Sequence, residues 1–214
     1  MLPPTKTGHN GTGWCRGNGV YGDVKEGWGL MREAEIYREQ IADLSAALAI
    51  QTTEIADDLL YTRPGAKLNP VGFLYWHLLR VWDFDLALSA GTSPTEDIWH
   101  RGDYAERSGY QPDGLGLRGT GMGVGYTDAQ VDAVRVPTDI LIAYHQQLLA
   151  ETTALLATAD DATLRASRPS PANPGQQITG TARLQHTVSH SHGHLGEIRF
   201  IKGMLGFPDP SYPR

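Results

Sequence analysis

The chain has very little cysteine, no long apolar run and no cluster of basic residues. Cys15 is the only cysteine among the 214 residues, which excludes an internal disulfide. No apolar stretch reaches the roughly 18 residues that a membrane-spanning helix needs. The formal net charge is −6 and Lys and Arg form no run, which argues against a surface that binds nucleic acid. We therefore expect neither a membrane nor a nucleic acid as a partner.

The beginning of the chain also lacks the charged and apolar regions of a secretory signal, so we expect a cytoplasmic protein. Its length suits one domain with a core of its own. Residues 1–29 are rich in glycine and aromatic residues and have neither helical nor strand periodicity. We predict an irregular N-terminal arm over 1–29, carrying an inert Cys15, followed by a single domain over 30–214.

Four stretches carry the spacing of helices, and the first two are clear. Apolar residues three to four positions apart predict a helix over about 31–60, with a break near Gln51. The second helix occupies about 69–90, because Asn69 is a good N-cap and Pro70 suits the first helical position.

The third and fourth stretches also have start or stop signals. Thr127-Asp128-Ala129-Gln130 is a capping-box pattern, and Pro137 interrupts the helix that it opens, which then continues to about residue 157. The last helix runs from about Thr179 and ends before Gly206. No strand pattern alternates convincingly, so we predict an all-α, up-down four-helix bundle with one long crossing loop.

That loop covers 91–126, between the second and third helices, and it is rich in glycine. It is long for a loop in a compact domain, so we expect a lid or a wall of the substrate site. Its Gly114-x-Gly116-x-x-Gly119 matches the dinucleotide-binding fingerprint in letters, but no strand precedes it and no βαβ unit surrounds it. We read it as a glycine-rich loop. A second connection, polar and proline-rich, covers 158–178.

Four of the eight histidines lie within nine residues of the last helix. On a helical wheel His186, His190 and His194 share one narrow stripe with Glu197, whereas His192 points to solvent. Histidines four positions apart stand roughly 6 Å apart and can share a metal ion, whereas His186 and His194 are too distant. The spacing alone allows two ligand pairs, 186/190 or 190/194. The alternative reading of the cluster is a solvated polar stripe.

A catalytic metal site takes three protein ligands and keeps one position open, so a third ligand must come from elsewhere. His77 is the best candidate, because it lies on the inward face of the second helix among Phe73, Leu74 and Val81. A single inward histidine is more often a hydrogen-bonded core residue. Because His77 would face a helix that carries two histidines four positions apart, we favour its interpretation as a metal ligand.

The sequence resembles the DinB/YfiT-like superfamily in His190-x-x-x-His194-Leu-Gly196-Glu197-Ile198 and in Trp76-His77-Leu78. The resemblance covers most of 31–206 and leaves the first 30 residues unmatched. It implies a four-helix bundle, commonly a homodimer, that holds a divalent metal with three histidines. Carried onto this sequence, the ligands are His77, His190 and His194.

The resemblance also guides the function that we expect. Relatives in the branch similar to mycothiol-dependent maleylpyruvate isomerase use a low-molecular-weight thiol as co-substrate. The first hypothesis is therefore a thiol-dependent S-transferase or isomerase, in which the metal activates the thiolate against a small electrophilic substrate. Zinc is the metal expected from base rates, with nickel, iron, manganese or copper as alternatives. Two other hypotheses are a metal-hydroxide hydrolase and a non-catalytic metal-binding protein.

Several other polar residues have predicted roles. Glu197 is read first as an acceptor that orients a ligand histidine, and otherwise as a general base or fourth ligand. Glu197 or His186 is the candidate catalytic proton shuttle.

Three further predictions concern the second and third helices. Arg80 and Asp83 form an i,i+3 pair on the polar flank, and Asp85 can reach an imidazole. Tyr144 and His145 are core residues with satisfied polar tips or line the pocket. Thiol recognition would use arginines of the loop: Arg101, Arg107 and Arg118.

Overall fold

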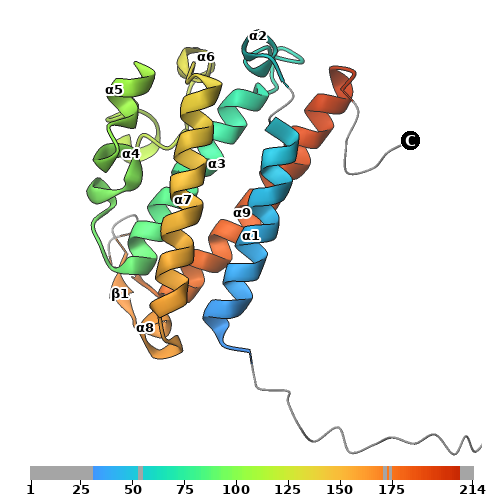
Figure 1. The fold of residues 1–214 in the computed structure, drawn as a ribbon. Coiled ribbons are helices and arrows are strands. Elements are labelled where there is room, and N and C mark those ends of the chain that lie inside the picture. Colours follow the sequence, from blue (N-terminus) through green and yellow to red (C-terminus); the bar gives the residue numbers. More distant parts are fainter. Residues whose placement is uncertain (1–30, 53–54, 171–172, 174, 208–214) are drawn as a thin grey trace, which may run out of the picture. The chain divides into compact units, whose positions relative to one another are not determined.

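A computed structural model describes residues 31–52, 55–170, 173 and 175–207 (Figure 1). The predicted arm over 1–29, with Cys15, lies outside the described residues. Arg32 onward forms one unit. No helix in the described part of the chain is long and apolar enough to cross a membrane.

Four long helices make up this unit: α1 (Glu33–Thr52), α3 (Val71–Ala90), α7 (Thr138–Thr158) and α9 (Gly180–Met204). The predicted all-α four-helix bundle is confirmed. Both α1 and α3 pack against α7 and α9, so α1 and α3 lie on one diagonal of the bundle. Their facing sides bury one apolar core that includes Leu44, Trp76, Leu148 and Ile198.

The directions of the helices follow from the long connection between α3 and α7. In Figure 1, α1 and α9 run one way and α3 and α7 run the other, because this connection returns the chain to the end where α3 began. The order is thus up, down, down, up, with the single crossing connection that the sequence predicts. As a result α3 and α9 lie antiparallel along their lengths, and they share the most extensive contact in the bundle.

The helix ends agree closely with their sequence signals. A short helix, α2 (Asp57–Leu60), follows α1, as the predicted break near Gln51 requires. Pro70 is the N-cap of α3, one residue later than predicted, and Gly91 closes this helix in the left-handed conformation with φ 77°. The predicted capping box of Thr127 and Gln130 is present and opens α6 (Asp128–Ala133).

The two connections contain more regular structure than predicted. Segment 91–126 carries four short elements: η1 (Pro94–Glu96), α4 (Ile98–Arg101), α5 (Tyr104–Ser108) and η2 (Leu117–Gly119). The second connection carries α8 (Asp161–Arg165) and two antiparallel strands, β1 (Arg168–Pro169) and β2 (Gln177–Ile178). Elements of two to five residues are too short to show helical or strand periodicity, so the sequence pattern misses them.

Arg80 and Asp83 form the predicted i,i+3 pair, but the pair is buried and does not lie on a polar flank, so that part of the prediction is wrong. Both side chains are buried, and Arg80 Nη1 donates to Asp97 Oδ2 at 2.9 Å and lies 3.4 Å from Asp83 Oδ2. Asp83 also accepts bonds from the backbone N–H groups of Ile98 and Trp99. The physical reason is that α4 folds over this face of α3 and covers it. A helical wheel of α3 alone contains no information about that cover.

Tyr144 and His145 are core residues with satisfied polar tips, one of the two predicted readings. Tyr144 donates its hydroxyl hydrogen to Asp83 Oδ2 at 2.6 Å. The His145 ring nitrogens lie 2.9 Å from Ser45 Oγ and 2.7 Å from Tyr75 Oη. Such a fully paired polar group can be buried at little cost.

Candidate metal centre

Three histidines converge between α3 and α9. His77 on α3 faces His190 and His194 on α9, and one ligand atom from each lies within 4.8 Å of the others. The ring centroid of His77 is 5.1 Å from that of His190 and 4.9 Å from that of His194. The antiparallel packing of the two helices brings these rings together. Of the two pairs that the spacing allows, 190/194 is the one that meets His77.

The hydrogen bonds of two of these rings fix which nitrogen is free. His77 Nδ1 donates its hydrogen to the backbone carbonyl of Met122. His194 Nδ1 donates to Glu197 Oε2 at 2.8 Å. In each ring the proton is therefore on Nδ1, which leaves the Nε2 lone pair available to a cation. His190 Nε2 lies 3.2 Å from His194 Nε2, so these two nitrogens face the same point.

Burial keeps two of the rings uncharged. It lowers the pKa of His77 to about 4, and it lowers the pKa of His190 to about 3, with the neighbouring His77 and His194 adding to the effect. Neutral imidazole is the form that binds a metal ion. Three imidazoles form a donor set that suits zinc and other borderline divalent cations. The residues present therefore fit the metal that the resemblance implies.

Glu197 lies on the outer side of His194. Its side chain is 56% exposed, and its carboxylate contacts Nδ1, the nitrogen opposite the candidate ligand atom. This is the position of an acceptor that orients a ligand histidine, rather than of a fourth ligand. The described contacts give it no place at the convergence point.

His186 lies one turn before His190 and belongs to a different cluster. Its Nδ1 is 2.6 Å from Asp85 Oδ2, and this hydrogen bond raises the pKa of His186. Asp85 is buried and also accepts a bond from Thr187 Oγ1 at 3.2 Å. Asp85 thus reaches an imidazole, as predicted. The ring centroid of His186 is 5.3 Å from that of His190, and His192 is exposed, as the wheel predicts.

The glycine-rich segment 121–125 covers His77. Gly123 has φ +92°, and a Cβ atom there would lie 2.9 Å from His77 Nδ1 and 3.2 Å from Trp76. Only glycine allows the backbone to approach the ring this closely. The sequence pattern missed the Met122 carbonyl and Gly123 as parts of the site. Their signal was the glycine at every second position from 119 to 125.

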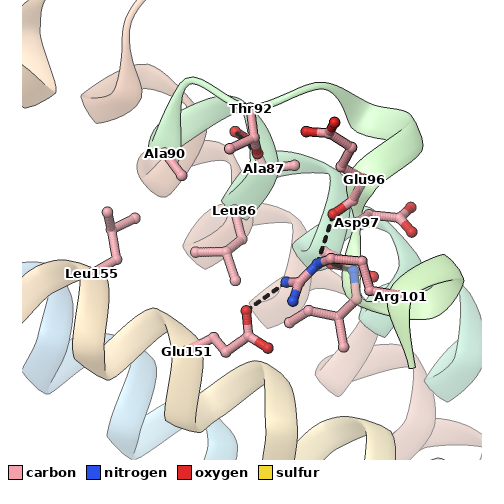
Figure 2. A pocket seen from close by; sticks show the side chains of 11 residues that line it. Leu86, Ala87, Ala90, Thr92, Glu96, Asp97, Arg101, Glu151 and Leu155 are labelled. Atoms are coloured by element: carbon pink, nitrogen blue, oxygen red, sulfur yellow. Dashed lines mark hydrogen bonds and ion pairs between the residues drawn. The ribbon is translucent and has the colours of Figure 1, made fainter.

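The three arginines predicted to recognise a thiol have other contacts. Arg101 donates to Glu151 Oε2 at 2.6 Å and to the Glu96 carbonyl at 2.8 Å (Figure 2). It lines a cavity of about 480 Å³ whose walls include Leu86 and Leu155. Arg107 lies over the ring of Tyr104, and Arg118 donates to Asn173 Oδ1. Among the described residues, the contacts of these arginines are therefore with groups other than the three histidines.

Comparison with known proteins identifies a family and several structures of similar fold. A sequence model of the DinB superfamily matches residues 37–198, which is more than half of the chain. No curated protein sequence matches the chain. A conserved protein from Enterococcus faecalis is similar in structure, with a TM-score of 0.68 and 17% identity, over 82% of this chain and 99% of that one.

The second similar structure is YfiT from Bacillus subtilis, described as a probable metal-dependent hydrolase with an unusual four-helix bundle topology. The TM-score is 0.56 and the identity 17%, over 88% of this chain and 97% of that one. At 17% identity, the similarity of each structure to this chain shows a shared fold alone.

Proposed function

Because the chain belongs to the DinB superfamily, we propose that it is a metal-dependent enzyme that acts on a small molecule. His77, His190 and His194 are the proposed ligands. The observation that carries this proposal is the convergence of three imidazoles from two helices, two of them with Nδ1 held by an oxygen acceptor. A solvated polar stripe would not place a buried histidine of another helix at the same point.

A divalent cation bound there would supply Lewis acidity, which favours the deprotonated form of water or of a thiol at neutral pH. Zinc suits three imidazoles best, and nickel, iron, manganese or copper are the alternatives. The chain's own contribution is to fix Nε2 of His77 and His194 through their Nδ1 hydrogen bonds and to cover His77 with segment 121–125. His186 Nε2 is placed one turn away, where it can accept a proton, since Asp85 holds Nδ1.

For the reaction class, the first proposal is a thiol-dependent S-transferase or isomerase with a small electrophile as substrate. The resemblance to the mycothiol-dependent branch supports it. The second proposal is a hydrolase that acts without a thiol. Two observations support the hydrolase: the description of YfiT and the Asp85–His186 pair beside the histidine cluster.

One experiment separates the two classes. The metal-loaded protein is given 1-chloro-2,4-dinitrobenzene with and without mycothiol, and p-nitrophenyl acetate without any thiol. A transferase consumes the aromatic chloride only with the thiol, whereas a hydrolase releases p-nitrophenol without it. The His192→Ala variant, altered at an exposed histidine of the same helix, should keep either activity, and His77→Ala should lose it. Equal turnover by His77→Ala and the unaltered chain would refute both classes.

A further inference from the structure

A second cavity, of about 320 Å³, lies along α3 beyond His77, with Arg80 and Phe84 in its lining. We call it the Arg80 cavity. Its lining comes from α3, from the η1–α4 region and from the loop before Gly121, and includes Arg80, Phe84, Thr95, His100, Asp113 and Thr120.

Two elements connect the Arg80 cavity to His77. His77, Arg80 and Phe84 are spaced three and four positions apart, so they follow one face of α3. Gly119 and Thr120 line the cavity, and the segment that follows them contacts His77 through the Met122 carbonyl. A molecule in the cavity would therefore lie one helical turn from His77.

Arg80, which lines this cavity, has one unused donor. The residue is 1% exposed, and its hydrogen bonds to Asp83, Asp97 and Tyr144 all run from Nη1. Its Nε–H is buried and has no hydrogen-bond partner among the described residues. Buried N–H groups are rarely left unpaired, so an acceptor from outside the chain would complete this one.

Phe84 offers an apolar surface beside that donor. It is partly exposed, whereas every other residue from Val71 to Ser89 is buried. Since Phe84 lines the cavity, its ring is available to a ligand instead of being packed in the core. Aromatic and unsaturated groups stack favourably on such a ring.

The charges around the cavity decide which acceptor fits. Arg80 is already opposed by the carboxylates of Asp83 and Asp97, and His100 lies between Asp97 and Asp113. Three carboxylates against one arginine and one histidine leave no surplus positive charge. A neutral carbonyl oxygen can accept from Arg80 Nε without adding a further negative charge, unlike a carboxylate.

We propose that the Arg80 cavity binds the apolar, carbonyl-bearing part of the substrate, with an aromatic or unsaturated group on Phe84 and a neutral carbonyl oxygen at Arg80 Nε. This inference rests on the proposed function, because it assigns the substrate's position in that enzyme. It names the substrate class as a small unsaturated or aromatic carbonyl compound.

Benzamide is a suitable probe, because it has an aromatic ring and a neutral carbonyl. The ¹H–¹⁵N signal of Arg80 Nε is followed by NMR while benzamide is titrated into the full-length, metal-loaded protein. We expect a saturable shift of this signal, and weaker binding of benzoate. Thr95→Trp, which fills the cavity from an exposed position, should weaken benzamide binding by about tenfold or more. Thr92→Trp, at the cavity of Figure 2, is the matched control and should leave it unchanged.

Phe84→Ala gives a second readout and should also weaken benzamide binding, without altering the buried charges. No saturable shift, or equal binding by Thr95→Trp and Thr92→Trp, would overturn the proposal. Repeating the titration with His190→Ala separates the proposed binding cavity from the proposed metal-dependent function. Benzamide binding that persists in this variant would show that the cavity binds its ligand without the metal. If the unaltered protein binds benzamide but takes up no metal, the cavity stands and the proposed function is refuted. Metal binding and turnover without benzamide binding would support the proposed function and overturn the assignment of the cavity.

Discussion

The rings of His77 and His194 are oriented for metal binding by hydrogen bonds to groups that are not metal ligands. The Met122 carbonyl and the Glu197 carboxylate each accept the Nδ1 hydrogen, so both rings have their Nε2 lone pair directed inward. Burial keeps His77 and His190 neutral. His77 and His190 therefore do not have to lose a proton when the cation arrives.

Glu197 should therefore affect metal affinity although it is not a ligand. We predict that Glu197→Ala weakens metal binding by about 10- to 100-fold, because His194 loses the acceptor that fixes its tautomer and orientation. Competition with a chromophoric chelator measures the affinity. Glu39→Ala, at an exposed position of α1, is the control and should bind like the unaltered chain. An unchanged affinity for Glu197→Ala would show that its hydrogen bond has no such role.

His145 predicts a pH dependence of stability that is independent of the metal. Burial lowers its pKa to about 4 in the folded state, against 6.5 ordinarily. Between these values the unfolded chain binds the extra proton, so the free energy of unfolding falls as the pH falls through this window. The loss due to His145 is on the order of 3 kcal/mol.

Denaturant unfolding of the metal-free protein at several pH values measures this loss, with His145→Gln for comparison. The variant should have a shallower pH dependence by that amount, while His77 and His190 contribute equally to both proteins. Parallel curves for the two proteins would contradict the assignment.

The antiparallel pair α3 and α9 could be predicted as the frame of the site, but the loop that closes it could not. The helical wheels place His77 inward and His190 and His194 on one stripe, which local spacing determines. The contacts of Met122 and Gly123 depend on how segment 91–126 folds over α3. That path is set by distant contacts, such as Asp83 holding the N–H groups of Ile98 and Trp99.

Gly123 tests whether the close approach of this loop matters. Gly123→Ala should lower the free energy of unfolding by about 1–3 kcal/mol, because the residue has φ +92° and its Cβ would crowd His77. Metal affinity should fall as well, since the His77–Met122 bond would shift. Thermal unfolding and chelator competition measure the two effects.

Gly193→Ala is the matched control within α9, between His190 and His194. A Cβ there meets nothing within 4 Å, so the change should stabilise the helix by up to about 1 kcal/mol and leave metal affinity unchanged. If Gly123→Ala behaved like this control, the loop would not position His77.

The arrangement of the four helices around the core could not be predicted from the sequence. Four helices and their ends follow from periodicity, caps and glycine or proline stops. Their order around the core does not, because an apolar face shows that a helix is packed but not which neighbour covers it. The crossing connection makes α3 parallel to α7 and leaves α9 as its antiparallel partner. The three histidines meet only because of this arrangement.

The central claim is that one metal ion is held by His77, His190 and His194. Elemental analysis of the purified protein tests it most directly, with the three single alanine variants and with His192→Ala as the control. Circular dichroism checks that each variant is folded. The account predicts about one divalent metal per chain in the unaltered protein and in His192→Ala, and roughly tenfold less in the other three. A folded His77→Ala, His190→Ala or His194→Ala protein that retains the full metal content would contradict it.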